Sequence, residues 1–394
     1  MPTVLRVCFA TVALSGSVVA QISGNFYLDK SIFAPGEPVF LHFQTTNNGP
    51  KSAKMGQADP YTFCAGYQIK TSGDPADPSP HSSCVVGFAG DCLSSAMTIN
   101  PGESKSESIL LNFEHDLSKP GEYEIEAARR FSYADAALDY FKAPKESIEA
   151  QAKLYFRIDP DLTINSEILH AFVDQLHSQD STKRIEAART LASIAPVSLE
   201  DLLLTFADDR EFQQFAPLAL HRLNTPRSMA KMAEMLSKTH PGTYEHMKAA
   251  KYLAESGDRQ WFPLLLEIAR NNAKIGTYVM YAAELGGAAM LPSLMDLLRS
   301  PDKEFTRLNA ISGFGFTGTR EAIPILIELL KGSDTRTIGY AERSLEILTH
   351  HTADQNWNNN LGPAYQKWSQ WWVRSGPTAP IYGREECGEI TPFD

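Results

Sequence analysis

The sequence lacks the short motifs that usually hold catalytic metals or activated nucleophiles. None of its ten histidines is followed by glutamate, and no Cys-x-x-Cys or Gly-x-Ser-x-Gly pattern occurs. Zinc hydrolases, zinc-binding modules and α/β-hydrolases depend on these patterns. We therefore expect no catalytic residues, no metal site and no bound cofactor, and we do not expect an enzyme.

Positive charge and long apolar runs are also scarce. The 36 Lys and Arg residues are outnumbered by 47 Asp and Glu, which gives a net charge of −11. An acidic chain is repelled by phosphate backbones, so we expect no nucleic-acid partner. After the first residues, no stretch approaches the roughly 18 apolar residues that a membrane span needs. The mature chain is therefore expected to have no transmembrane segment.

Residues 1–20 have the composition of a cleavable signal peptide. Arg6 is their only charge, an apolar run follows from Val7 to Leu14, and small residues lead to Ala20 before Gln21. A short apolar core followed by small residues is typical of secretory signals. We expect an exported protein, either periplasmic or extracellular.

The cysteines fit an oxidising compartment. Removing the signal peptide removes Cys8 and leaves Cys64, Cys84, Cys92 and Cys387. An even number of cysteines in an exported protein favours disulfides over a zinc site. Four cysteines allow three connectivities, and the sequence does not choose among them. The short segment between Cys84 and Cys92 favours that pair, which would leave Cys64 to pair with Cys387.

Residues 21–160 alternate with the period of β-strands. Short β-rich segments are separated by Gly and Pro turns, a pattern that predicts a β-sandwich. The expected strands are Val39–Thr45, Cys64–Ile69, Ser106–Phe113, Tyr123–Ala127 and Leu154–Ile158. The stretch Tyr133–Ala150 has a helical composition and predicts a helical insertion before the last strand.

Two short segments of this region have a pattern that is more specific to one fold. Ala34-Pro35-Gly36-Glu37-Pro38 precedes a strand, and Leu117–Ile125 places a Pro-Gly turn before Tyr123. Pro and Gly set the turn geometry, and a tyrosine there can bury its ring while its hydroxyl reaches the backbone. Both segments resemble the corresponding segments of secreted immunoglobulin-like modules. That resemblance implies a binding module, a spacer or, as in one related group, a proteinase inhibitor.

From residue 161 to 349 the pattern repeats about every 30 residues. A large apolar anchor residue recurs, and the position four residues earlier is Ala in five of six cases and Tyr281 in the sixth. The anchors are Leu191, Leu220, Leu253, Leu285, Phe314 and Leu345. Such a period, with two helical patterns in each unit, predicts an α-solenoid of about six helical pairs. A small residue after four of the anchors would let neighbouring helices approach closely.

The best-defined unit, Thr306–Leu330, is expected to form a helix, a Gly-rich turn and a second helix. Its motif Arg307-x-x-Ala-x-x-x-Phe-Gly-x-x-Gly318 resembles the short HEAT-like repeat of phycobilisome lyases. Gly313–Gly318 also matches the dinucleotide-binding pattern Gly-x-Gly-x-x-Gly, which requires a preceding strand. Because a helix precedes it here, we interpret these glycines as a tight turn between helices.

Residues 350–394 form a C-terminal cap and tail that begin with an aromatic cluster. Its members are Trp357, Tyr365, Trp368, Trp371 and Trp372. Three of them recur at helical spacing, which predicts a helix covering the apolar end of the array. The alternative is an exposed platform for a sugar or a peptide.

The second helix of each pair lines the concave side of HEAT-type arrays, and the resemblance implies a binding surface there. Aligning the repeats on their anchors places six Tyr, Lys and Arg residues on second helices. They are Tyr244, Lys248, Tyr278, Arg307, Tyr340 and Arg343. We expect an exported, non-enzymatic binding or scaffold protein that uses this surface for a protein or peptide partner. Three alternatives stay open: burial of these residues between repeats, a proteinase-inhibitor-like or carbohydrate-binding role for the sandwich, and an enzyme whose site the sequence does not reveal.

Overall fold

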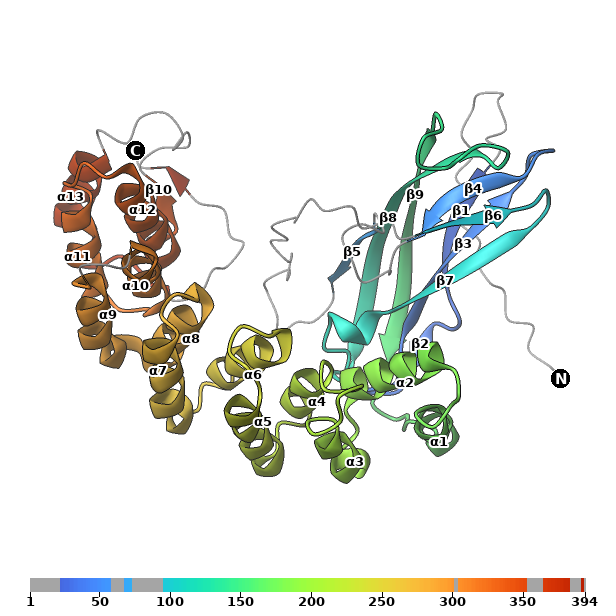
Figure 1. Ribbon diagram of the computed structural model, residues 1–394, viewed down its shortest axis with the longest axis horizontal. Helices are drawn as coiled ribbons and strands as arrows, with labels where there is room; N and C mark the ends of the chain where they lie inside the picture. The colour runs from blue at the N-terminus through green and yellow to red at the C-terminus, as the bar shows by residue number, and fades with distance from the viewer. Residues whose placement is uncertain are drawn as a thin grey trace. The chain divides into compact units, whose positions relative to one another are not determined.

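The computed structural model divides into two compact units, residues 1–171 and residues 172–394. The structure describes residues 22–57, 67–72, 95–300, 304–352, 364–382 and 391–392. The first unit consists mainly of β-strands and the second mainly of helices (Figure 1). A β region followed by about a dozen helices is the order that the sequence predicts. In the described part of the chain, no helix combines the length and apolarity needed to cross a membrane.

Two sheets build the first unit. The smaller sheet is antiparallel, with the order β1 (Ile22–Leu28), β3 (Phe40–Asn47) and β7 (Ser104–Leu110). The larger sheet has the order β2 (Ile32–Phe33), β9 (Glu146–Ile158), β8 (Gly121–Asp135), β4 (Ala53–Gln57) and β6 (Ser95–Ile99). The remaining strand, β5 (Tyr67–Ser72), pairs with the first half of β8.

Both sheets contribute to one hydrophobic core. In β3 buried and partly buried residues alternate, so that Leu41 and Phe43 point inward. From the other sheet Ile125 and Phe156 join the same cluster, and the ring of Phe156 stacks on Tyr123 with centroids 5.1 Å apart. The hydroxyl of Tyr123 donates to the Lys119 carbonyl oxygen at 2.8 Å. The predicted burial of this tyrosine with a backbone partner is confirmed.

The helical insertion predicted for Tyr133–Ala150 is wrong. β8 extends to Asp135 and β9 begins at Glu146, so the region belongs to a long antiparallel hairpin. The side chains of Phe131 and Tyr133 are buried in alternation along β8, and this period-two pattern outweighs the local helical composition.

A buried charge connects the two sheets. Arg129 on β8 is 2% exposed, and its guanidinium forms an ion pair with Glu107 on β7 at 3.0 Å. The rings of Phe43 and Tyr67 lie against the guanidinium at 4.6 and 4.3 Å. The Tyr67 hydroxyl donates to the same carboxylate at 2.7 Å, and burial raises the pKa of Tyr67 well above its usual value. Arg129 therefore has both an anionic partner and aromatic faces in the interior.

The helices follow one another in six consecutive pairs. The first members are α1 (Ser166–Gln175), α3 (Glu200–Thr205), α5 (Pro226–Lys238), α7 (Phe262–Asn271), α9 (Leu291–Leu298) and α11 (Ala322–Leu329). The second members are α2 (Ser181–Ile194), α4 (Ala216–Leu223), α6 (Tyr244–Glu255), α8 (Gly276–Gly286), α10 (Glu304–Phe316) and α12 (Thr335–Thr349). Short 3₁₀ turns occur at Leu111–Phe113, Val197–Leu199, Arg259–Trp261 and Gly287–Met290.

The even-numbered helices pack in succession, α2 on α4 and onward to α12. Figure 1 shows them together along one side of the helical row. Each carries one of the six predicted anchors, and every anchor side chain is at most 5% exposed. The repeating pattern in the sequence therefore reflects the contacts between consecutive second helices.

The interpretation of Gly313 and Gly315 as a turn between helices is wrong. Both lie inside α10, and the turn follows at Gly318, whose φ is +59°. A Cβ atom on Gly315 would lie 2.9 Å from the Cα atom of Ser344 on α12. A Cβ atom on Gly313 would lie 2.7 Å from a methyl carbon of Leu294. These glycines serve close helix packing, which outweighs their poor helix propensity.

The C-terminal segment returns to the last repeats. Helix α13 (Ala364–Arg374) packs on α11, and the short strand β10 (His351–Thr352) pairs in parallel with β11 (Thr391–Pro392). The Arg320 guanidinium donates to the carbonyl oxygens of Gly376 and Ala379. The Tyr382 amide donates to the Leu348 carbonyl oxygen at 2.9 Å. Residues 375–382 are thus fastened to the turn before α11 and to the end of α12.

A pair of Gly→Ala substitutions tests the contact between α10 and α12. Gly315→Ala and Gly339→Ala both gain helix propensity, but a Cβ atom on Gly339 meets nothing within 4 Å. We expect Gly315→Ala to be less stable than Gly339→Ala by about 1–3 kcal/mol, the cost of overpacking. Chemical denaturation followed by far-UV circular dichroism measures the difference. Equal stability of the two variants would show that the contact tolerates a methyl group.

A second pair of substitutions tests the buried charge. Glu107→Gln leaves the buried Arg129 without its anion, and we expect a loss of about 3 kcal/mol in the free energy of unfolding. Glu149→Gln is the matched control, because it removes the carboxylate that pairs with the neighbouring, exposed Arg130. The control is expected to retain wild-type stability. A loss of similar size in both variants would contradict a special role for Arg129.

Candidate functional site

The six residues predicted to bind a partner lie on four successive second helices. Tyr244 and Lys248 are on α6, Tyr278 on α8, Arg307 on α10, and Tyr340 and Arg343 on α12. Because these helices pack in order, the residues belong to one layer of the helical unit. The structure separates them, however, into exposed and buried groups.

Tyr244 and Tyr340 are exposed, with 50% and 42% of their surfaces accessible. The Lys248 ammonium lies 5.5 Å from the Tyr244 ring centroid and 6.0 Å from that of Tyr252. Tyr252 in turn stacks on His221 of α4, with ring centroids 4.3 Å apart. The aromatic side chains on α6 are therefore held by neighbours on their own helix and on α4.

Arg307 is exposed, and Arg343 is partly exposed and pairs with Glu346 at 3.4 Å. Arg307 lies near Asp334, which caps the start of α12. The pKa of Asp334 is lowered chiefly by a hydrogen bond from the Thr337 hydroxyl, and the charge of Arg307 contributes least. Both arginines could therefore meet an anionic group at the solvent side of α10 and α12.

Tyr278 is not on this surface. Its side chain is 1% exposed, and its hydroxyl oxygen accepts from the Gly242 amide at 2.8 Å. The hydroxyl proton is then available to His246, whose Nδ1 atom is 2.7 Å away. His246 is also 1% exposed. The Tyr278–His246 pair connects α8 to α6 and to the turn before α6. Tyr278 therefore stabilises the packing of these helices.

Phe305, which the sequence analysis did not identify, belongs to the exposed group. It lies in the first turn of α10 and is 67% exposed. Aligning α10 with α6 on their anchors, Phe314 and Leu253, places Phe305 in the same row as Tyr244. The repeat alignment could have found it, but an exposed phenylalanine has no distinguishing sequence signal. We call Tyr244, Phe305 and Tyr340 the aromatic row.

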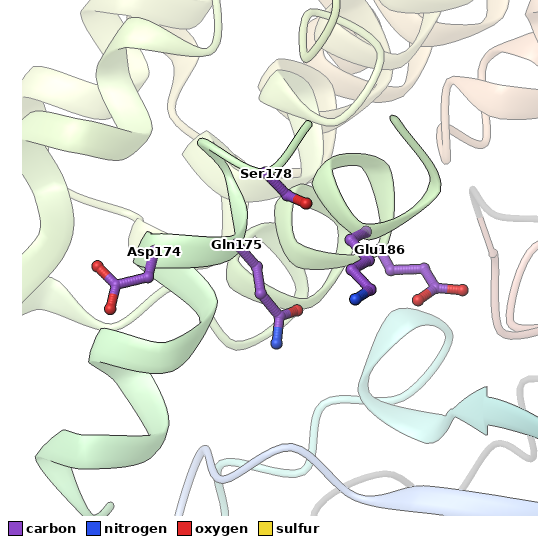
Figure 2. A pocket seen from close by; sticks show the side chains of 5 residues that line it. Asp174, Gln175, Ser178 and Glu186 are labelled. Carbon is purple, nitrogen blue, oxygen red and sulfur yellow. The ribbon is translucent and has the colours of Figure 1, made fainter. Parts of the chain in front are cut away.

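A shallow pocket lies at the first helical pair. It has a volume of about 490 Å³ and is lined by Asp174, Gln175, Ser178, Lys183 and Glu186. Figure 2 shows the carboxylates of Asp174 and Glu186 pointing away from each other. No group of three potential metal ligands is found among the described residues. The pocket therefore offers no convergent set of side chains.

Several predicted features fall outside the described residues. They are the four cysteines Cys64, Cys84, Cys92 and Cys387, together with Trp357. Within the described part of the aromatic cluster, Trp368 is fully buried and Trp371 is 9% exposed. Both belong to the core of the helical unit, with Tyr365 and Trp372 packed against it. This burial leaves Trp368 no face for stacking on a sugar.

Comparison with known proteins identifies a HEAT-like repeat in the helical unit. The profile of the PBS lyase HEAT-like repeat matches residues 306–332, which contain most of α10 and all of α11. No curated protein sequence matches the chain at a significant level.

Three solved structures of bacterial alpha-2-macroglobulins show a weak similarity. A mutant of the Salmonella protein is 11% identical, covering 84% of this chain and 26% of that chain, with a TM-score of 0.18. The native Escherichia coli protein is 11% identical over 83% and 25%, with a TM-score of 0.18. The Escherichia coli protein activated by porcine elastase is 12% identical over 82% and 35%, with a TM-score of 0.19. The chain therefore spans about a quarter to a third of these proteins.

Buried His246 makes stability depend on pH. Burial lowers its pKa, with a smaller lowering from His240, while the hydrogen bond to the Leu236 backbone opposes the shift. The unfolded chain then takes up a proton near pH 6.5, above the pKa of the folded state. Stability is therefore full above about pH 6.5 and falls as the pH decreases toward the folded-state pKa. We expect this decrease to be shallower in His246→Gln, measured by thermal unfolding between about pH 7.5 and pH 5.

The control for this experiment is His170→Gln, which replaces an exposed histidine on α1. It is expected to keep the pH dependence of the wild-type protein. The assignment is wrong if His246→Gln loses stability on acidification as steeply as the wild type does.

Proposed function

We propose that the protein is an exported, non-enzymatic binding or scaffold protein of the periplasm or the extracellular space. In this proposal an immunoglobulin-like sandwich precedes a HEAT-like solenoid, and the second helices of the solenoid bind a protein or peptide partner. The observation that carries the proposal is the aromatic row, Tyr244, Phe305 and Tyr340, exposed on α6, α10 and α12.

The packing of the helical unit supports the solenoid. Each anchor is buried, and each second helix contacts the second helix of the next pair. Because such contacts link only neighbouring repeats, the array presents one continuous surface along α6 to α12. The match to the HEAT-like repeat at residues 306–332 agrees with this view.

The chemistry of the surface supports a protein partner. Large exposed aromatic side chains are unfavourable in water, and when grouped they often mark binding surfaces. Tyrosine and arginine are the residues that frequently dominate the free energy of protein interfaces. Arg307 and Arg343 lie on the same helices as Phe305 and Tyr340. We therefore propose a partner segment that carries apolar and acidic side chains.

The sandwich assignment is supported by two features of the first unit. Two sheets share one core, and Tyr123 buries its ring while its hydroxyl bonds to a carbonyl four residues upstream. Export is proposed from residues 1–20 and the cysteine count alone. The proteinase-inhibitor-like alternative would depend on the segment 72–92, most of which lies outside the described residues.

Binding experiments with the chain from Gln21 onward test the proposal. The partner is first isolated from the cell-envelope fraction of the source organism, and its affinity is then measured with purified components. We expect Tyr244→Ala and Phe305→Ala each to weaken binding at least about tenfold, as expected for central interface residues. Charge reversal at Arg307 and Arg343 is expected to weaken it further and to reduce its dependence on salt.

The matched control is Val373→Ala, which removes an apolar side chain that is 78% exposed on α13. Its affinity is expected to equal that of the wild type. Wild-type affinity in both aromatic variants and in the charge-reversed variant would refute binding by the second helices.

A further inference from the structure

The outer face of the sheet β1-β3-β7 has an unusual composition. The register places three side chains in each cross-strand row, and none of the nine residues is Asp, Glu, Lys or Arg. The rows are Ser23-Thr46-Ser104, Asn25-Gln44-Ser106 and Tyr27-His42-Ser108. The residues between them, such as Phe26, Leu41 and Phe43, point into the core. We call these nine residues the polar face.

Hydrogen bonds between strands hold these side chains in place. The hydroxyl groups of Thr46 and Ser104 are 2.8 Å apart. His42 contacts the Ser108 hydroxyl through Nδ1 at 2.9 Å and the Asp29 carboxylate through Nε2 at 3.0 Å. The ring of Tyr27 stacks on His42 with centroids 4.9 Å apart and an interplanar angle of 22°. Contacts within the protein therefore hold side chains in the first and third rows of the polar face.

The other sheet differs in charge. Its outer face carries ion pairs such as Lys153 with Glu124 at 2.7 Å and Arg130 with Glu149 at 3.1 Å. Asp29, which is 65% exposed, contacts the polar face at its margin beside His42. In a chain of net charge −11, a surface of hydroxyl and amide groups without Asp, Glu, Lys or Arg among its nine residues matches a ligand that is itself uncharged and rich in hydroxyl groups.

We infer that the polar face binds a neutral glycan chain. The aromatic pair Tyr27–His42 offers a surface for the apolar face of a sugar ring, and the Asp29 carboxylate can accept hydrogen bonds from sugar hydroxyls. The Ser, Thr, Asn and Gln side chains supply further donors and acceptors. The face runs about 13 Å along β3 from His42 to Thr46, at roughly 3.3 Å per residue, which is long enough for a short run of sugar rings.

The same three groups, Ser108, His42 and Asp29, have the hydroxyl–imidazole–carboxylate order of a hydrolytic triad. Here they lie on an open sheet face, with Ser108 and Asp29 exposed, and not in a cleft that excludes water. The geometry therefore points to ligand binding and not to hydrolysis.

Affinity electrophoresis of the chain from Gln21 onward tests this inference. The probes are two neutral polymers, hydroxyethyl cellulose and pullulan, and the polyanion alginate. We expect retardation by at least one neutral polymer and none by alginate. Tyr27→Ala is expected to weaken the interaction about tenfold, and Tyr27→Phe, which keeps the stacked ring, to retain most of it. Asp29→Asn is expected to weaken it several-fold.

Tyr155→Ala is the matched control, because Tyr155 is 60% exposed on β9 of the other sheet. It is expected to bind as the wild type does, and far-UV circular dichroism checks that each variant is folded. Three results would overturn the inference: no retardation by either neutral polymer, stronger retardation by alginate, or equal losses in Tyr27→Ala and Tyr155→Ala. The variants of the aromatic row do not touch this face, so the two proposals fail independently.

Discussion

The close approach of consecutive second helices is the constraint on which the helical unit depends. At the contact between α10 and α12 there is no space for a Cβ atom on Gly315, and the position four residues before the anchor is Ala in five of the six second helices. Small residues here set the spacing of the helices, and the buried anchors set their rotation. Because rotation is fixed, the opposite side of each helix is fixed as well. The core therefore positions the aromatic row: Tyr244 and Phe305 lie nine residues before their anchors, and Tyr340 lies five residues before its own.

In the β unit, a buried ion pair and not a close backbone contact specifies how the elements pack. Its sheets present alternating faces that would pack in more than one register, and a one-residue slip would move every side chain to the other face. The ion pair of Arg129 with Glu107 joins β8 of one sheet to β7 of the other, and a one-residue slip of either strand would break it. Aromatic rings cover the guanidinium, which is 2% exposed, so the positive charge of the pair is shielded from water. A polar contact in the core thus selects one arrangement among several of similar hydrophobic content.

The parts of this structure that were predictable from the sequence are those governed by periodicity. The anchors, the order of β region and helices, and the burial of Tyr123 follow from local spacing. The close contact of Gly315 with a neighbouring helix follows from its position after the anchor Phe314, whereas the packing of Gly313 against Leu294 on another helix has no signal in the repeat pattern. The surface residues were harder still. The sequence leaves open whether the candidate residues are exposed or buried between repeats; Tyr278 is buried and bonds to His246, and Phe305 was missed. The grouping of Ser108, His42 and Asp29 depends on strand register, which the sequence leaves open.

The fastening of residues 375–382 affects the order in which the helical unit comes apart. In an array of repeats held by neighbour contacts, unfolding begins at the ends, where a repeat has one neighbour instead of two. Arg320 ties two carbonyl oxygens of this segment to the turn before α11, and Tyr382 bonds to the end of α12. The contacts of residues 375–382 must therefore break before the helical pair α11 and α12 can unfold from its end. The amide protons of α11, α12 and residues 375–382 will then exchange with solvent together, as one cooperative unit.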